Sequence, residues 1–237
     1  MNTSLANQIA EALSSHTLLP EFNDELTLEQ AYEIQHAVTQ LRSPDRIGGI
    51  KAGVTSKIAQ GFLKLEHALI GSLYADTRHT DGSTIPYLEG RSLECEVAVI
   101  VDGNGRPKEI APAIEGVYVN YSRQSDMSAA SLVTCNLGAD LFIVGDFQPW
   151  NAKSEQSTIE LKHDGDLVNA SSVTEALQGP ASATSWMWEE AIKRGFNPTD
   201  GTLLLTGACG TVVPAEPGQY KADFGTLGKL TFSVEAP

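Results

Sequence analysis

The segment Leu93-Glu94-Cys95-Glu96-Val97-Ala98-Val99-Ile100-Val101 decides how this chain is organised. Its valines stand at alternate positions, which is typical of a β-strand. Because successive side chains of a strand point to opposite faces, Glu94 and Glu96 project to the same face, about 7 Å apart. Two carboxylates this close on an apolar strand repel each other unless a cation lies beside them.

Two interpretations of this glutamate pair are open. In the first, the strand lies at the edge of a sheet and both glutamates face water. In the second, they bind a hard divalent ion such as Mg²⁺, which prefers oxygen ligands. A third carboxylate, Glu115, stands in the apolar run Pro112-Ala113-Ile114-Glu115-Gly116-Val117. Acidic groups in hydrophobic surroundings are typical of functional sites, so Glu115 strengthens the metal interpretation.

A lysine in a glycine-rich run is the second candidate for chemistry. Lys51 lies in Gly48-Gly49-Ile50-Lys51-Ala52-Gly53, where the glycines permit close approach of a backbone or a ligand. It is either a snorkelling lysine at a strand end, or a cation or base that faces an anionic ligand. Ser56 follows as a candidate N-cap for a helix that begins at Lys57.

Composition limits the classes of partner. The chain has 237 residues, 41% of them apolar, which is enough for one large core. Its net charge of −14 argues against nucleic acids and anionic membranes as partners. The three cysteines, Cys95, Cys135 and Cys209, are too far apart in sequence to suggest a motif and predict buried, reduced thiols. We therefore expect a soluble cytoplasmic protein without a membrane segment.

Local signals predict several helices and hairpins. Thr27, with Gln30 three residues later, predicts a capped helix that ends before Ser43-Pro44. Further expected elements are a helix over residues 3–15, hairpin turns at 102–105 and 164–166, a strand over 158–162, a helix over 180–194 and a strand at 203–205. No phosphate-binding loop, dinucleotide fingerprint, zinc motif or nucleophile elbow occurs in the sequence.

Five segments in series resemble one known family. They are Gly49-Ile50-Lys51-Ala52-Gly53-Val54-Thr55-Ser56-Lys57, Leu93-Glu94-Cys95-Glu96-Val97-Ala98, Pro112-Ala113-Ile114-Glu115, Gly179-Pro180 with Trp186, and Leu204-Leu205-Thr206-Gly207-Ala208. In this order they are similar to the 2-oxopent-4-enoate hydratases and 4-oxalocrotonate decarboxylases of the fumarylacetoacetate hydrolase superfamily. The likeness runs from about residue 27 to the C-terminus.

The resemblance implies a mixed α/β fold, with a fumarylacetoacetate-hydrolase-like β-roll core and N-terminal helices. We expect residues 1–45 to form a helical segment and residues 46–237 a catalytic domain. The family implies Mg²⁺ or Mn²⁺ held by three carboxylates, with Lys51 as the catalytic acid, base or charge partner. The metal ligands would be Glu94, Glu96 and Glu115, and the substrate pocket would be bordered by Ser56, Thr206 and Gly207.

The chain departs from the family in two places. Members often carry Pro-Asp ahead of the glycine that corresponds to Gly71, whereas this chain has Glu66-His67-Ala68-Leu69-Ile70. Where hydratases commonly show Asp-Asn-Ala-Ser, this chain has Cys135-Asn136-Leu137-Gly138. Both departures bear on the addition of water rather than on metal binding. Glu66 and His67 are the candidates to replace the missing aspartate.

The resemblance implies an enzyme of aromatic catabolism. The first hypothesis is a metal-dependent lyase that adds water to 2-hydroxypenta-2,4-dienoate or a close analogue. A 4-oxalocrotonate-type decarboxylase and an acylpyruvate C–C hydrolase are the alternatives among enzymes, and an inactive oxo-acid-binding subunit is the alternative outside them. The expected substrate is a small 2-oxo or 2-hydroxydienoic acid. We also expect a homo-oligomer, and a complex with another enzyme of the same pathway is a second form of assembly.

Overall fold

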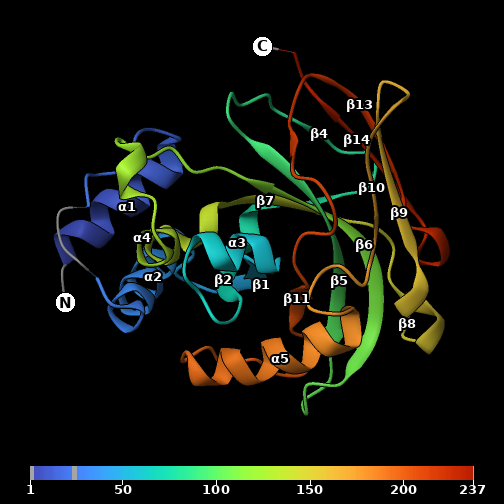
Figure 1. Cartoon of the computed structure of the whole chain (residues 1–237), viewed down its shortest axis with the longest axis horizontal. Coiled ribbons are helices and arrows are strands. Elements are labelled where there is room, and N and C mark those ends of the chain that lie inside the picture. Colours follow the sequence, from blue (N-terminus) through green and yellow to red (C-terminus); the bar gives the residue numbers. More distant parts are fainter. Residues whose placement is uncertain (1–2, 23–25, 237) are drawn as a thin grey trace.

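The computed structural model describes residues 3–22 and 26–236, and residues 1–2, 23–25 and 237 lie outside the described part (Figure 1). The α-helices are α1 (Thr3–Ser15), α2 (Leu28–Arg42), α3 (Lys57–Phe62), α4 (Ala129–Thr134) and α5 (Pro180–Lys193). The strands are β1 (Ile47–Gly53), β2 (Leu69–Tyr74), β3 (Arg78–Thr80), β4 (Thr84–Ile85), β5 (Ser92–Val101), β6 (Pro107–Val117), β7 (Ala139–Val144), β8 (Gln148–Pro149), β9 (Thr158–His163), β10 (Asp166–Ser172), β11 (Leu203–Leu205), β12 (Val213–Pro214), β13 (Gly218–Asp223) and β14 (Lys229–Val234).

The ends of several elements follow from local hydrogen bonds that the sequence predicts. Thr27 and Gln30 form a capping box at the start of α2, in which each side chain accepts from the other residue's backbone N–H. The Ser56 hydroxyl caps α3 by accepting from the backbone of Ala59 at 3.1 Å. In the hairpin between β5 and β6, the carboxylate of Asp102 accepts from two backbone N–H groups of the turn.

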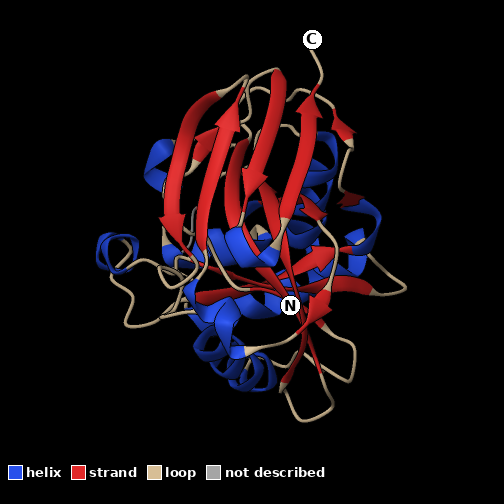
Figure 2. Ribbon diagram, turned by 90° about the vertical axis from the view of Figure 1, so that its right-hand side faces the viewer, coloured by secondary structure: helices blue, strands red, loops and turns tan. Residues whose placement is uncertain are grey.

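Two sheets carry the fold. The larger has nine strands, with the order β2-β1-β11-β5-β6-β7-β3, while β12 pairs with β5 and β8 with β6. The smaller has five strands in the order β10-β9-β13-β14-β4, and Figure 2 shows its long strands side by side. Parallel pairs, such as β1 with β11, occur among mainly antiparallel ones. The structure therefore confirms the mixed α/β fold.

The main core lies between the two sheets. Val97 and Val99 of β5 belong to one buried apolar cluster with Leu161 of β9 and Phe232 of β14. The strand β5 is an interior strand, because β11 pairs along one side and β6 along the other. The interpretation that its glutamates line a solvent-facing edge strand is therefore wrong.

Strand register places the candidate residues on the other face of the larger sheet. Lys51 of β1 lies opposite Gly71 of β2 and Leu205 of β11. Leu205 in turn lies opposite Ala98, two residues along β5 from Glu96. Residues directly opposite each other in a sheet share a face, and so do residues two apart on one strand. Lys51 and the glutamates of β5 therefore point to the same side, although about 45 residues separate them in sequence.

The N-terminal helices cover one end of this arrangement (Figure 1). The helix α2 packs against α1, α4 and β2. It buries Ala31, Tyr32, Ile34 and Val38. The spacing of three and four residues from Ala31 to Ile34 and on to Val38 is that of one apolar helix face. The division into residues 1–45 and 46–237 stays a prediction.

Two further expectations concern the whole chain. All three cysteines, Cys95, Cys135 and Cys209, are buried and unpaired, as predicted. Among the described residues, no helix combines the length and the apolar character needed to cross a membrane.

The core between the sheets predicts a difference between two leucines of the smaller sheet. Leu161 is fully buried, whereas Leu167 of β10 is 55% exposed. We expect Leu161→Ala to lower the free energy of unfolding by about 2–5 kcal/mol, and Leu167→Ala to change it by less than about 0.5 kcal/mol. Urea unfolding of both variants measures the difference. Equal losses would show that the smaller sheet does not enclose the core as described.

Candidate active site

Strands β5 and β6 bring the three predicted metal ligands together. Glu94 lies opposite Glu115 in the ladder between the two strands, and Glu96 follows on the same face. One carboxylate oxygen from each residue lies within 4.8 Å of the other two. Glu96 and Glu115 are fully buried, and Glu94 is partly exposed at the open side of the cluster.

The oxygens of this cluster fit a divalent cation. Among the described residues, Glu96 Oε1 and both side-chain oxygens of Glu115 lack a hydrogen-bond partner. Glu96 Oε2 accepts from the backbone N–H of Gly207 at 2.8 Å. Buried carboxylate oxygens without partners are unfavourable, and a hard cation with oxygen ligands removes that penalty. The role of these residues as metal ligands stays a prediction that the geometry supports.

Lys51 supplies the positive charge of the site. Its Nζ lies 2.6 Å from Glu115 Oε1, and the lysine is 1% exposed. The two groups form a buried ion pair, so the ammonium of Lys51 is the partner of Glu115 Oε1. Nζ also donates to the backbone oxygen of Leu137 at 3.4 Å. The interpretation of Lys51 as a snorkelling lysine is therefore wrong, since its amine is enclosed.

Burial and charge act in opposite directions on these groups. Burial raises the pKa of Glu115 to about 7, although Lys51 acts to lower it. Burial, together with the neighbouring carboxylates, raises the pKa of Glu96 well above its usual value. Burial also raises the pKa of Glu94. Burial lowers the pKa of Lys51, but the three glutamates outweigh it and the net shift is upward. The amine is therefore held as an ammonium group.

The loop after β11 forms one border of the site. Thr206 is buried, and its hydroxyl oxygen has no hydrogen-bond partner among the described residues. Gly207 has φ 103° and packs directly against Thr55, so that a side chain at this position would collide with Thr55. Its N–H is thereby aimed at Glu96. The structure brings Thr206 and Gly207 to the carboxylates, and their contact with a substrate stays a prediction.

Ser56 and the residues ahead of Gly71 are placed differently. Ser56 is exposed, and its hydroxyl is used in capping α3, so its role toward a substrate stays a prediction. Glu66 is exposed, and the His67 ring contacts the backbone oxygen of Ala68. Within the described part of the chain, neither contacts Lys51. Leu69, which lies opposite Gly53, shares the face of Lys51 instead.

The family resemblance singled out Cys135-Asn136-Leu137-Gly138 as a departure, but the sequence did not reveal that this turn contacts Lys51. The backbone oxygen of Leu137 is the second oxygen partner of the lysine. The useful signal was the pair Asn136 and Gly138, because asparagine and glycine are the residues that best tolerate positive φ.

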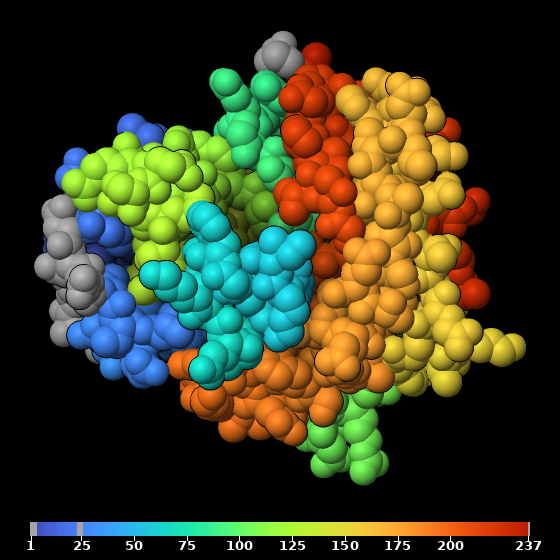
Figure 3. All heavy atoms as spheres, viewed as in Figure 1, coloured from blue at the N-terminus to red at the C-terminus, as the bar shows by residue number. Residues whose placement is uncertain are grey.

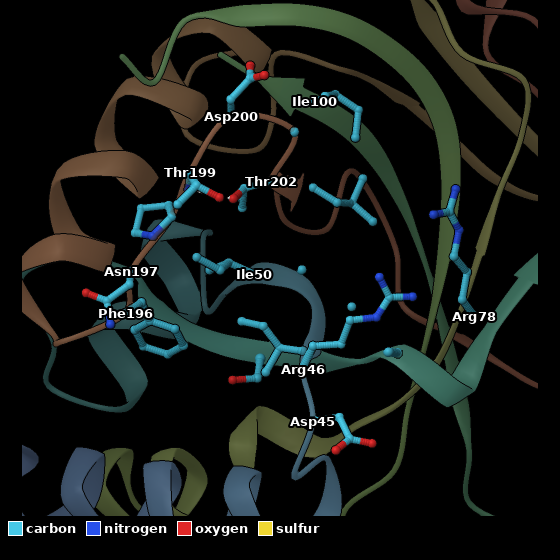
Figure 4. A pocket seen from close by; sticks show the side chains of 18 of the residues that line it. Asp45, Arg46, Ile50, Arg78, Ile100, Phe196, Asn197, Thr199, Asp200 and Thr202 are labelled. Atoms are coloured by element: carbon cyan, nitrogen blue, oxygen red, sulfur yellow. Dashed lines mark hydrogen bonds between the residues drawn. The ribbon is translucent and has the colours of Figure 1, made fainter. Parts of the chain in front are cut away.

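The surface is hollowed where the cyan segment that holds α3 meets green and red segments (Figure 3). A separate cleft of about 770 Å³ opens at the other end of the same sheet face, where Gly49, Ile100 and Leu203 lie. Figure 4 shows Arg46 and Arg78 on one side of that cleft. It contains none of the predicted site residues, and an apolar cluster that includes Leu73, Phe142 and Leu205 lies between the two openings.

Several known enzymes are similar to this chain in sequence. No family model matches the chain. A 2-keto-4-pentenoate hydratase of Paraburkholderia phymatum is 27% identical over 253 residues, which cover 97% of this chain and 96% of the relative. A 2-hydroxyhexa-2,4-dienoate hydratase of Comamonas testosteroni is 28% identical over 255 residues, which cover 96% of this chain and 94% of the relative.

Solved structures share the fold. The 4-oxalocrotonate decarboxylase from Pseudomonas putida, complexed with magnesium and adipate, superposes with a TM-score of 0.88 at 20% identity, covering 98% of this chain and 96% of that chain. The fumarylpyruvate hydrolase from Pseudomonas aeruginosa, in complex with Mn²⁺ and pyruvate, has a TM-score of 0.60 at 16% identity, covering 79% of this chain and 89% of that chain.

The curled sheet has the fold of these two solved structures. In sequence, the chain is similar over nearly its whole length to 2-keto-4-pentenoate and 2-hydroxyhexa-2,4-dienoate hydratases. The resemblance seen in the five ordered sequence segments is thereby confirmed.

The carboxylate cluster predicts the effect of single substitutions on metal affinity. We expect Glu96→Gln and Glu115→Gln each to weaken Mg²⁺ binding at least about tenfold, because each removes a charged ligand (about 1.4 kcal/mol). Glu109→Gln is the matched control, since Glu109 lies on the same strand β6 but is exposed. Calorimetric titration with Mg²⁺ measures the affinities. Unchanged affinity in the Glu96 and Glu115 variants would refute the assignment.

The raised carboxyl pKa values predict how stability depends on pH without metal. A raised pKa in the folded chain means that the native state binds more protons than the unfolded chain, between the ordinary value of 4.5 and about 7 for Glu115. Stability therefore falls as pH rises through this range. In a metal chelator, we expect a lower Tm at pH 8 than at pH 6, by roughly 3 °C or more, and excess Mg²⁺ should restore it. Thermal unfolding of the wild type and of Glu115→Gln, which should show a weaker pH dependence, checks this.

Proposed function

We propose that the protein is a divalent-metal-dependent lyase that adds water to 2-hydroxypenta-2,4-dienoate or a close analogue in aromatic catabolism. The observation that carries the proposal is the set of buried carboxylates with unpartnered oxygens beside an enclosed ammonium group. The hydratase relatives, which match this chain over nearly its whole length, support the same reaction.

In this proposal Glu94, Glu96 and Glu115 hold Mg²⁺ or Mn²⁺. When bound, the ion supplies a Lewis acid that polarises the 2-oxo group of the acid and stabilises its enolate form. Lys51 carries a proton at Nζ beside these carboxylates, where it balances the substrate's negative charge and exchanges a proton with the substrate carbon chain. Thr206 and the exposed end of the cluster at Glu94 border the space left for the substrate.

A decarboxylase is the second candidate, and one observation favours it. The face beside Lys51 carries Leu69 and Gly71, so β2 supplies no acid to this face. When the distal carboxylate of 4-oxalocrotonate leaves as CO₂, the electrons of the broken C–C bond form a dienolate that takes up one proton, whereas hydration also needs a group that activates water. A C–C hydrolase is disfavoured, because none of the five histidines, all within the described residues, forms an ion pair or hydrogen bond with a glutamate.

The assembly and location are part of the proposal. We expect a homo-oligomer, in which the N-terminal helices are the candidate contacts, and a cytoplasmic location, which three reduced buried cysteines suit. Size-exclusion chromatography with light scattering tests the assembly.

Turnover of three substrates tests the function. With Mg²⁺, we expect loss of hydroxydienoate absorbance without pyruvate release. Release of CO₂ from 4-oxalocrotonate would instead indicate the decarboxylase, and release of pyruvate from an acylpyruvate would indicate the hydrolase.

We expect Lys51→Met to lower kcat at least about 100-fold, since it removes the acid–base group. Lys57→Met, which changes an exposed lysine six residues later, should have no effect. Binding of Mg²⁺ and oxalate without any turnover would identify an inactive binding subunit.

A further inference from the structure

A left-handed turn joins α4 to β7 beside the proposed site. Asn136 has φ 54°, Leu137 has φ 54° and Gly138 has φ 67°. Side chains other than glycine rarely adopt this conformation, and leucine gains nothing locally by doing so. Contacts outside the turn must therefore hold it, and such enforced conformations are concentrated at functional sites.

The side chain of Asn136 provides that hold. Its Oδ1 accepts from the backbone N–H of Ser72 at 2.8 Å, and its Nδ2 donates to the backbone oxygen of Ser72 at 2.8 Å. Asn136 is fully buried, and both ends of its amide are satisfied by one residue of β2. The turn is thereby attached at two points to the strand that pairs with β1.

The attachment aims Leu137 at the lysine. The backbone oxygen of Leu137 accepts from Lys51 Nζ at 3.4 Å, and Glu115 Oε1 occupies a second direction of the ammonium group. The side chain of Leu137 covers Gly53 and Gly71, which lie on the same sheet face as Lys51. An ammonium group has three N–H donors, so these two oxygens leave one donor to be directed elsewhere.

We propose that Asn136 is a positioning residue for the reaction. By locking the turn, it fixes the oxygen of Leu137 against Lys51 and so directs the third N–H of the ammonium toward the substrate. The neutral carbonyl orients the amine without adding charge to a crowded acidic site. This inference rests on the proposed function, in which Lys51 exchanges a proton with the substrate.

Two variants of Asn136 test the inference. Asn136→Asp is nearly isosteric but places an oxygen against the Ser72 carbonyl, and Asn136→Gly keeps the freedom for positive φ while removing both hydrogen bonds. Gln35→Leu is the matched control, because the buried Gln35 amide donates to the backbone of Ile70 on the same strand and, among the described residues, forms no hydrogen bond with the turn. Concentrations of folded sites are measured by titration with Mg²⁺ and oxalate.

We expect both Asn136 variants to lower kcat per folded site at least about 30-fold, with KM and Mg²⁺ affinity within about threefold of the wild type, because misplacement of a catalytic group affects the chemical step. Gln35→Leu should lower Tm but keep kcat. A kcat within twofold of wild type in both Asn136 variants would overturn the inference, as would parallel losses in the control.

A measurement that does not depend on turnover separates this inference from the proposed function. The ¹⁵Nζ signal of Lys51, identified by its absence in Lys51→Met, should shift or broaden in Asn136→Gly and stay unchanged in Gln35→Leu. An unchanged signal in Asn136→Gly refutes the positioning role even if the wild type turns over no dienoate. In the converse case, the wild type turns over no dienoate while the signal still shifts in Asn136→Gly. The shift then supports the positioning of Lys51 by Asn136, and the lack of turnover refutes only the proposed function.

Discussion

Repulsion among three clustered carboxylates, two of them fully buried, is the constraint on which the site depends. Glu94, Glu96 and Glu115 are brought together by strand register, and the fold offers them one internal cation, the ammonium of Lys51. One positive charge does not balance three negative ones, so the cluster without metal remains protonated in part, in line with the raised pKa of Glu115. The same deficit gives the site its affinity for a divalent ion, because binding replaces shared protons by a stronger charge.

Much of the fold could be predicted from local sequence, because its causes are local. The capping box of Thr27 and Gln30, the turn at Asp102 and the alternation along β5 each depend on residues a few positions apart. The pairing of β1 with β11 could not be predicted in this way. Lys51 and Leu205 lie about 150 residues apart, and no local pattern in either strand specifies which strand pairs with it.

The site shows the same division. The sequence predicted the glutamates as a group and Lys51 as a candidate, yet it left open whether the lysine reaches water. Its burial depends on β2, on the turn at Leu137 and on Glu115, which are contributed by three separate parts of the chain. Ser56 illustrates the converse case: a residue carried over from a motif uses its hydroxyl for a helix cap, which the capping signal alone would explain.

The packing of Leu137 on two glycines limits how this protein can evolve. A methyl group at position 53 would lie 2.9 Å from Leu137 Cδ1, and one at position 71 would lie 3.4 Å from it and 2.9 Å from Asn136 Oδ1. The sizes of the side chains at positions 53, 71 and 137 can therefore change only together. A lineage that acquires a larger residue at position 53 must first replace Leu137 by a smaller one, and one that does so at position 71 must also move Asn136. Either change would remodel the enclosure of the amine in the same step.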